Sequence, residues 1–352
     1  MRIAWFGSSL VSSYWNGAAT YYRGLVRALH ARGHRSSFYE PDAYDRQAHR
    51  DLSDPDWAEV VVYRPEAWEA VLEHARGADV VVKASGVGVN DAELEAGVLE
   101  LDAPLTVFWD VDAPATLARL ENDPDDPLRE LVPRYDLVLT YGGGDRVVAS
   151  YRALGARECV PVYNALDPET HHPVARDPRF TADLAFLGNR LPDREERVEE
   201  FLLRTAERAP RRSFLLGGAG WASRPLPANV RLLGHVPTAE HNAFNVTPLA
   251  VLNISRESMA ANGFSPATRI FEAVGAGACL ISDAWEGIEL FLEPGEEVLV
   301  AHGGGEVTAL LEELTPERAR AIGVRARRRV LAEHTYVRRA EQVESLLQGV
   351  AA

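Results

Sequence analysis

The sequence predicts an α/β protein built from two doubly wound domains. Its 352 residues are enough for two domains of about 150 residues each. Short Val-rich segments alternate with amphipathic helical segments, which is typical of a parallel sheet with helices on both faces. The alternation stops once, at the polar and proline-bearing residues 162–180, and then starts again. We therefore expect a linker there, with one such domain on each side of it.

The first half contains six expected strands and two expected helices. The strands are residues 2–7, 35–40, 58–63, 79–86, 104–110 and 135–143. The helices are residues 17–33, where Gly33 is a usual stop, and residues 66–78. Ligands of such sheets bind beyond the carboxyl ends of the strands, so candidate site residues are sought in the loops that follow the strands.

The second half repeats this pattern. The expected strands are residues 182–188, 212–220, 230–237, 249–255, 278–283 and the end of 287–301. The expected helices are residues 194–210, 266–277, the start of 287–301, most of 304–335, and 336–350. We predict an N-terminal domain at 1–165, a C-terminal domain at 166–335 and a separate final helix at 336–352.

Composition excludes several classes of function. The chain is 46% hydrophobic and 25% charged, as in globular enzymes, and its net charge is −15. This charge argues against nucleic acid as a partner, because nucleic acid requires a basic face. No apolar run reaches the ~20 residues of a membrane helix. Cys159 and Cys279 lie in apolar stretches, so we expect two buried free thiols and a cytoplasmic protein without a zinc site.

The most informative motif is the helix at 266–277. Ser265 is a good cap and Pro266 is suited to the first helical position, so the free N–H groups of this turn form an anion site. Arg269 lies one turn further, and Glu272 falls seven residues after Ser265 on the same face. A phosphate at the cap and a ribose beside Glu272 would suit this arrangement. The alternative is a structural pairing of Glu272 with Arg269 or with the backbone.

Other candidates follow strand ends. Asp110 and Asp112 suit sugar hydroxyls, a general base or a metal, or a cap for the helix that starts near Pro114. Gly17 lies in a strand–loop–helix stretch of the kind that holds phosphate or sugar. Asn189, Arg190 and Arg194 form a basic loop suited to a diphosphate. His235 and Arg256 are candidates at two further strand ends. His171 and His172 are expected to be solvated in the linker.

With these residues in view, the chain resembles the GT-B glycosyltransferases, and especially their spore-maturation (CgeB-type) branch, which borders retaining family 4. Residues 252–301 carry most of the resemblance, and residues 16–34, 49–52 and 108–120 add to it. The resemblance implies two facing Rossmann-like domains with the active site in the cleft between them. The N-terminal domain would bind the acceptor, the C-terminal domain the donor, and the last helix would cross back to the N-terminal domain.

The resemblance also implies roles for individual residues. Glu272 would bind the ribose of a UDP, GDP or dTDP sugar, which is a donor substrate and not a cofactor. His235 and Val236 would lie beside the base. The remaining donor-binding positions would be Asn189, Arg190, Arg256, Ser265, Pro266, Ala267, Thr268 and Arg269. Apart from the resemblance, the strand–loop–helix position of Gly17 makes it a further candidate for donor binding. The acceptor would be a small molecule, a glycan or a protein.

One position departs from the family pattern. Retaining members often carry two glutamates seven residues apart, and Phe264 stands where the first of them would be. We expect a metal-independent, retaining glycosyltransferase. Three alternatives stay open: an inverting transferase with Asp110 or Asp112 as its base, a sugar-nucleotide 2-epimerase of the same fold, and a non-catalytic binding protein of two-lobed form.

Overall fold

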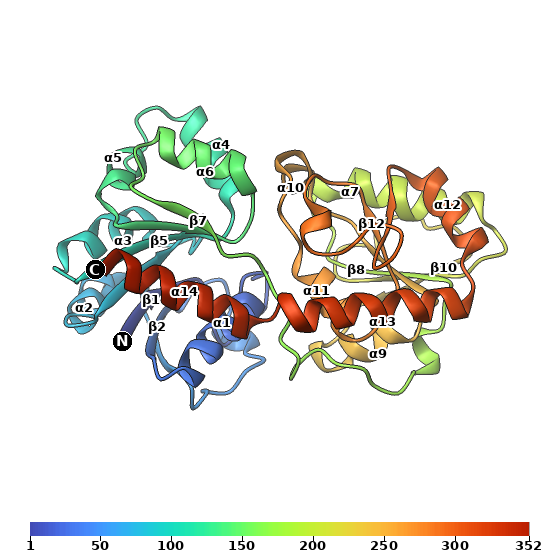
Figure 1. The fold of residues 1–352 in the computed structure, drawn as a ribbon, viewed down its shortest axis with the longest axis horizontal. Helices are drawn as coiled ribbons and strands as arrows, with labels where there is room; N and C mark the ends of the chain where they lie inside the picture. Colours follow the sequence, from blue (N-terminus) through green and yellow to red (C-terminus); the bar gives the residue numbers. More distant parts are fainter. Residues whose placement is uncertain (352) are drawn as a thin grey trace. The chain divides into compact units, whose positions relative to one another are not determined.

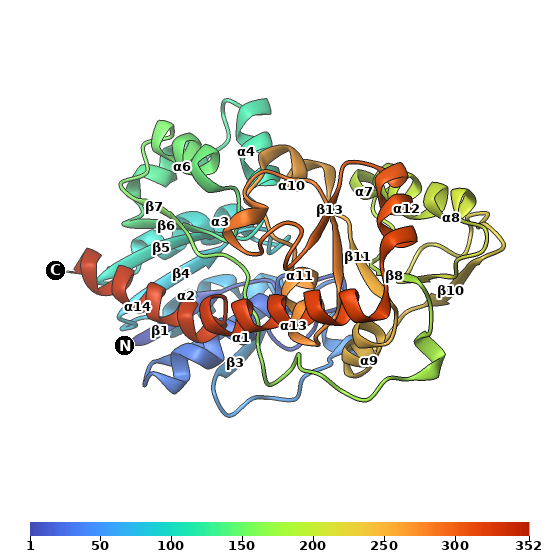
Figure 2. The ribbon, with the colours of Figure 1, turned by 45° about the vertical axis from the view of Figure 1, so that its right-hand side comes forward.

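The computed structural model describes residues 1–351 and divides the chain into two compact units. The first unit is Met1–Asn164 together with the segment from Tyr336 onward, and the second is Ala165–Thr335. Figures 1 and 2 show one sheet with flanking helices in each unit. Every strand pair in both sheets is parallel, so the predicted α/β class is confirmed.

The first unit contains a seven-stranded sheet in the order β3-β2-β1-β4-β5-β6-β7. Its strands are β1 (Arg2–Phe6), β2 (Arg35–Pro41), β3 (Glu59–Tyr63), β4 (Val80–Ala84), β5 (Leu105–Asp110), β6 (Leu137–Thr140) and β7 (Cys159–Pro161). The first six correspond to the six expected strands. The sequence did not reveal β7, because three residues are too few to produce a visible alternation.

Helices cover both faces of this sheet. They are α1 (Ala19–Ala31), α2 (Trp68–His74), α3 (Asp91–Gly97), α4 (Ala113–Asn122), α5 (Leu128–Leu131), α6 (Gly144–Ala153) and α14 (Tyr336–Ala351). Side chains alternate along β1, so Ala4 and Phe6 join the core under α2 to α6. Trp5 points the other way and packs against Trp109 of β5, with ring centroids 5.3 Å apart. The Trp109 indole N–H donates to the Tyr21 hydroxyl of α1 at 3.1 Å, which ties α1 to this face.

The last helix of the chain lies beside α1 (Figure 1). Gly24 of α1 makes this possible, because a Cβ at that position would lie 2.1 Å from the Tyr336 ring of α14. Arg339 Nε donates to the Tyr163 carbonyl at 3.0 Å, and Gln342 donates to the Pro161 carbonyl at 3.0 Å. The final helix is therefore an integral part of the first unit.

The second unit contains a six-stranded sheet in the order β10-β9-β8-β11-β12-β13. Its strands are β8 (Leu184–Leu187), β9 (Phe214–Gly217), β10 (Val230–Gly234), β11 (Ala250–Asn253), β12 (Leu280–Asp283) and β13 (Leu299–Ala301). Its α-helices are α7 (Pro192–Val198), α8 (Arg204–Arg208), α9 (His241–Val246), α10 (Glu257–Asn262), α11 (Thr268–Gly275), α12 (Gly304–Glu313) and α13 (Pro316–Glu333). The helix α11 contacts both α9 and α13 on one face, and α8 and α12 contact each other on the other.

Three segments of this unit differ from the expectation. The single helix expected at 194–210 is interrupted by a π-helical stretch, Glu199–Leu203. The helix expected at the start of 287–301 is only a 3₁₀ turn, Ile288–Leu290. The short helices α9 and α10 were not expected, because six residues do not display a full amphipathic pattern.

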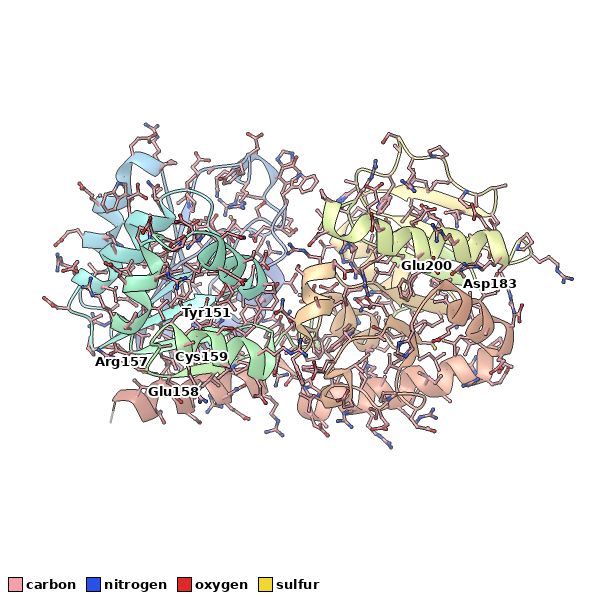
Figure 3. All side chains as sticks on the ribbon, turned by 90° about the horizontal axis from the view of Figure 1, so that it is seen from above. Tyr151, Arg157, Glu158, Cys159, Asp183 and Glu200 are labelled. Carbon is pink, nitrogen blue, oxygen red and sulfur yellow. The ribbon has the colours of Figure 1, made fainter. Side chains whose placement is uncertain are left out.

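Two expectations, on membrane helices and on the cysteines, can be compared with the structure. Within residues 1–351, no helix combines the length and the apolar run that a bilayer crossing requires. Cys159 and Cys279 are both buried and free, as predicted, and burial raises the pKa of each thiol to about 12. Figure 3 labels Cys159 and, on α6, Tyr151 in the same unit.

Candidate active site

The topology of the second sheet places one crevice beyond β8 and β11. These strands are neighbours in the middle of the sheet, and the chain leaves them in opposite directions. Open parallel sheets bind ligands at such a switch point, outside the carboxyl ends of the strands. Leu187 ends β8 and is followed at this edge by Gly188 and Asn189, Asn253 ends β11, and Asp283 ends β12.

Two arginines converge on Gly188 at this edge. A Cβ at Gly188 would lie 2.9 Å from Arg269 Nη2 and 3.0 Å from Arg194 Nη2. Arg269 donates from Nε to the Leu187 carbonyl at 2.7 Å, and its guanidinium lies 4.9 Å from the Phe186 ring centroid. Glycine at 188 therefore leaves room for two guanidinium groups where a side chain would displace them.

The positive charges of Arg194 and Arg269 are only partly balanced by neighbouring side chains. Arg194 is 8% exposed, donates to the Asn189 carbonyl, and has no hydrogen-bond partner for Nε among the described residues. Burial, followed by the nearby charge of Arg269, lowers the pKa of Arg194 to about 9. Burial also lowers the pKa of Arg269, and Glu272 and Asp283 oppose that shift. An anion bound here would restore the charge balance of both groups.

The start of the neighbouring helix differs from the prediction. Helix α11 begins at Thr268 after Ala267, and no side chain of the described residues caps it. Ser265 does not cap the helix, because its Oγ donates to the Gly263 carbonyl at 2.8 Å, and Pro266 precedes the helix instead of opening it. The Ile270 N–H donates to the Ala267 carbonyl at 3.0 Å, whereas the N–H groups of Thr268 and Arg269 meet no capping side chain of the described residues and suit an anion.

The loop before α11 has a strained backbone that the sequence analysis missed. Gly263 has φ 68° and Phe264 has φ 46°, a left-handed value that is unusual for a bulky residue. Phe264 N donates to the Glu286 carbonyl at 2.6 Å, and a Cβ at Gly287 would lie 2.2 Å from the Phe264 ring. The contacts with Gly287 hold this conformation, and strain of this kind is common at binding loops. The Asn262-Gly263 dipeptide was the available signal.

Glu272 lies on α11 one turn after Arg269. Its side chain is 16% exposed, and its Oε1 lies 3.9 Å from Nε2 of His171. Its carboxylate accepts no hydrogen bond in the part of the chain that the structure describes. The structure therefore does not lock Glu272 in an internal ion pair with Arg269, whose guanidinium is directed to Leu187 and Asn253.

Histidines surround Glu272, and one of them corrects a prediction. His171 is 3% exposed, whereas the linker histidines were expected to be solvated; only the adjacent His172 is exposed. The Asp167 carbonyl accepts the His171 backbone N–H at 2.9 Å, which folds the linker into a turn. His241 of α9 contacts the Val236 carbonyl at 3.2 Å, and burial lowers its pKa while the charge of Glu272 opposes that shift.

Of the other predicted donor residues, His235 and Val236 follow β10, whereas Asn189, Arg190 and Arg256 already have side-chain or backbone partners. His235 is exposed, and the Val236 side chain is buried in a small core with Phe180 and Phe244. Asn189 accepts from the Ala219 N–H at 2.9 Å. Arg190 pairs with Glu195 at 2.7 Å.

Arg256 pairs with Asp193 at 2.6 Å. Arg190 and Arg256 are thus already paired with carboxylates. Arg194 was expected only as part of the basic loop, but it lies with Arg269 beside Gly188.

In the first unit the structure separates the two candidate bases. Asp110 is fully buried and accepts from the Ser85 hydroxyl at 2.7 Å, from the Thr116 hydroxyl at 2.9 Å and from the Tyr151 hydroxyl. This enclosure argues against Asp110 as a base, since no substrate proton reaches it. Asp112 is the partly exposed N-cap residue of α4.

Gly17 lies in the loop before α1, and beyond its two chain neighbours no described residue has a heavy atom within 4 Å of a Cβ built on it. This loop position is thus open, whereas Asp110 is enclosed by its neighbours.

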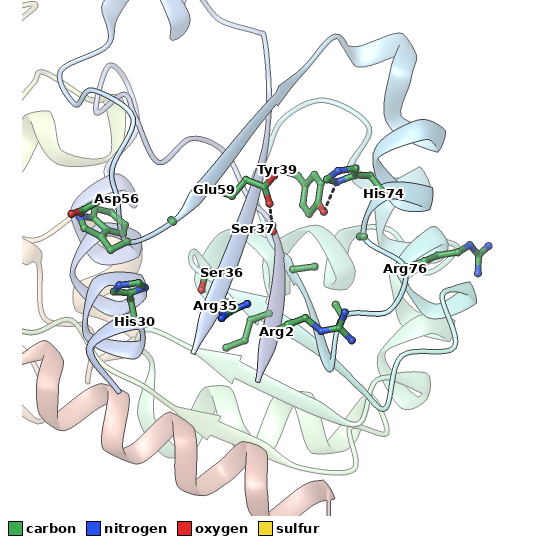
Figure 4. Close-up of a pocket in the computed structure, with 16 residues that line it drawn as sticks. Arg2, His30, Arg35, Ser36, Ser37, Tyr39, Asp56, Glu59, His74 and Arg76 are labelled. Atoms are coloured by element: carbon green, nitrogen blue, oxygen red, sulfur yellow. Dashed lines mark hydrogen bonds between the residues drawn. The ribbon is translucent and has the colours of Figure 1, made fainter. Parts of the chain in front are cut away.

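A cavity of about 540 Å³ lies elsewhere in the first unit (Figure 4). Its lining comes from the amino ends of β1, β2 and β3 and from the carboxyl ends of α1 and α2. Arg2, Arg35 and Glu59 are among the lining residues, and none of the predicted site residues is. It lies at the end of the sheet opposite to the ligand-binding edge of this fold type, so we do not take it as the active site.

Comparison with known proteins identifies the fold. The family model described as glycosyl transferase-like matches residues 194–345, and no curated protein sequence matches the chain. Sucrose-phosphate synthase from Thermosynechococcus elongatus superimposes with a TM-score of 0.73 over 99% of each chain, at 14% identity. The chain has the GT-B fold.

Two further GT-B structures contain donor-related ligands. HepE from Anabaena, in complex with UDP and glucose, superimposes with a TM-score of 0.69 over 99% of this chain and 100% of its own, at 12% identity. An E. coli structure described as trehalose-6-phosphate bound with UDP-2-fluoro glucose gives 0.69 over 99% of each chain, at 11% identity. The GT-B fold and the family-model match together support a glycosyltransferase enzyme.

Proposed function

We propose that this protein transfers a sugar from a nucleotide-diphosphate sugar to an acceptor, and that its second unit binds the donor. The observation that carries the proposal is the pair of converging arginines, Arg194 and Arg269, beside the uncapped start of α11. Glu272 lies one helical turn beyond them. A diphosphate would lie beside the two arginines, and the ribose attached to it would lie beside Glu272.

The proposed diphosphate site uses the two guanidinium groups and the first-turn N–H groups of α11. Charge-assisted hydrogen bonds from arginine to phosphate are among the strongest in proteins. As the bond between sugar and diphosphate breaks, negative charge builds up on the leaving diphosphate, and preorganised donors stabilise it. We propose that these groups suffice without a metal ion.

The ribose site would be the Glu272 carboxylate. A carboxylate accepts hydrogen bonds from a vicinal diol, as in the recognition of ribose by dinucleotide-binding proteins. We propose that the base lies near His235 and the Val236 backbone, on the loop that follows β10. UDP is the first nucleotide to test, because the HepE and E. coli structures hold UDP or a UDP sugar.

We propose that transfer proceeds with retention, that the first unit binds the acceptor, and that the protein acts in the cytoplasm. The enclosure of Asp110 supports retention, because it argues against one of the two residues proposed as the base of an inverting mechanism. The resemblance of residues 252–301 further favours the spore-maturation branch of the family.

The test is a thermal-shift screen against UDP, GDP, dTDP and ADP, followed by calorimetry with the best binder. A nucleotide at 100 times its dissociation constant should stabilise the protein by about 2.7 kcal/mol. The Glu272→Ala variant should bind that nucleotide about 1–3 kcal/mol more weakly, because a charged hydrogen bond is lost. Unchanged affinity would remove the ribose role of Glu272, and no shift with any of the four would contradict the proposal.

Incubation with the nucleotide sugar alone separates transfer from epimerisation. Slow release of free nucleotide and sugar supports a transferase. A product in which the sugar is epimerised while still attached to the nucleotide would identify a 2-epimerase instead.

A further inference from the structure

The turn Asp167–His171 packs against α11 at the start of the second unit. The Thr170 hydroxyl donates to Asp167 Oδ2 at 2.7 Å, and the Leu166 N–H donates to the His334 carbonyl at 2.8 Å. A Cβ at Gly275 of α11 would lie 2.3 Å from the Leu166 side chain and 2.9 Å from the His171 carbonyl. The turn is therefore held at both ends and lies directly on the helix that carries Glu272.

This packing places the His171 ring beside Glu272. Nε2 of His171 lies 3.9 Å from Glu272 Oε1, which is too long for a hydrogen bond but within range of an electrostatic contact. The ring is 3% exposed, and its Nδ1 has no hydrogen-bond partner among the described residues. A buried imidazole without a backbone partner is unusual, since burying a polar group without a hydrogen bond is unfavourable.

The other basic side chains near Glu272 either have hydrogen-bond partners or are exposed. Arg269 donates to Leu187 and Asn253, and His241 contacts the Val236 carbonyl. His235 is exposed and follows β10. His171 lies within 4 Å of the carboxylate, and its Nδ1 has no partner within residues 1–351, so the ring is free to serve Glu272.

We infer that His171 is a positioning residue for donor recognition, and that its Nε2–H directs the Glu272 carboxylate toward the ribose diol of the nucleotide. The contact shortens to a hydrogen bond when the ribose orders Glu272, because hydrogen bonds in a free site are often long. The inference rests on the proposed function, since it assigns Glu272 to the ribose. It adds a residue from the linker to the donor site.

The experiment compares the binding of UDP and of 2′,3′-dideoxy-UDP, which lacks the diol, by calorimetry. The variants are His171→Leu, which removes the N–H, and His171→Gln, whose amide retains an N–H donor. His172→Leu, at the adjacent exposed position, is the matched control. Glu272→Ala and the double variant with His171→Leu complete a double-mutant cycle.

We expect His171→Leu to weaken UDP binding roughly tenfold and to leave dideoxy-UDP binding within about twofold. His171→Gln should recover most of the loss, and His172→Leu should behave as the unchanged protein. In the Glu272→Ala background, His171→Leu should have no further effect, because the carboxylate that it positions is gone.

Two results would overturn the inference in distinguishable ways. If Glu272→Ala lowers the preference for UDP over dideoxy-UDP but His171→Leu weakens both nucleotides equally, His171 has only a structural role and the proposed function stands. If Glu272→Ala leaves the preference unchanged, or UDP does not bind, the ribose assignment itself fails and this inference fails with it.

Discussion

Individual residues of the candidate site are distinguished by what they already contact. Arg190 and Arg194 lie four residues apart in the stretch expected to be one basic loop, and Arg190 was the one expected to bind the donor. In the structure Arg190 makes a two-point pairing with Glu195 at 2.8 and 2.7 Å, whereas Arg194 is buried and its Nε has no partner within residues 1–351. A side chain with unused donors in a site of unbalanced charge is the better anion ligand.

Replacing Arg194 should therefore affect the diphosphate and not the nucleoside. We expect Arg194→Gln to weaken UDP binding by about 1.5–3 kcal/mol, the range for a hydrogen bond to a charged group. Uridine, which has no phosphate, should bind the variant and the unchanged protein equally well. Calorimetry with UDP and NMR titration with uridine measure the two effects.

Arg190→Gln is the matched control, because its guanidinium is already paired with Glu195. We expect it to change UDP affinity by less than about 0.5 kcal/mol. Equal losses in the two variants would mean that the loop acts through its general positive charge, and the convergence on Gly188 would lose its significance.

At the scale of elements, the sequence predicts long periodic segments well and their ends poorly. The strands from β1 to β6 and helices such as α1 and α13 follow directly from apolar periodicity. The start of α11 does not, because Ser265 can either cap a helix or bond to a nearby carbonyl, and tertiary contacts around Gly263 decide between them. Likewise, the burial of His171 depends on packing at Gly275, a contact that no local pattern encodes.

The pair formed by α1 and α14 permits a direct test of element packing. Ala in place of Gly24 would put a Cβ 2.1 Å from Cδ2 and 2.5 Å from Cγ of the Tyr336 ring. These atoms belong to the base of the ring and cannot move aside without shifting the helix. We expect Gly24→Ala to lower the free energy of unfolding by about 1–3 kcal/mol, although alanine favours the helical backbone itself.

The control lies on the partner helix. Gly349 of α14 is exposed, and a Cβ added there would meet no other described residue within 4 Å beyond its chain neighbours and the nearby backbone of α14. Gly349→Ala should therefore be neutral or stabilising by up to about 1 kcal/mol. Urea denaturation of both variants measures the difference. If Gly24→Ala were as stable as the original chain, close approach of the two helices would not require glycine.

At the scale of the whole molecule, two units with separate cores predict separate responses to a ligand. One hydrophobic core lies between the first sheet and the helices α2 to α6, and another lies within the second unit. The proposed donor groups Arg194, Arg269 and Glu272 all belong to the second unit. A donor nucleotide should therefore stabilise the second unit directly.

Scanning calorimetry tests whether the two units respond separately to a ligand. We expect UDP to raise the midpoint of the transition that belongs to the second unit, and Gly24→Ala to lower that of the first. Chain fragments are not needed, because the two perturbations mark the transitions in the intact protein. A single transition that both perturbations shift equally would show that the units unfold together.

The contact between α1 and α14 also constrains the order in which a newly made chain can fold. Residues 165–335 are continuous, so their sheet and helices can assemble while the C-terminal segment is still inside the ribosome. The partner of Gly24 is Tyr336, which is synthesised more than three hundred residues later. The first unit is therefore completed only after the second unit has been synthesised, and until Tyr336 emerges the side of α1 at Gly24 stays uncovered.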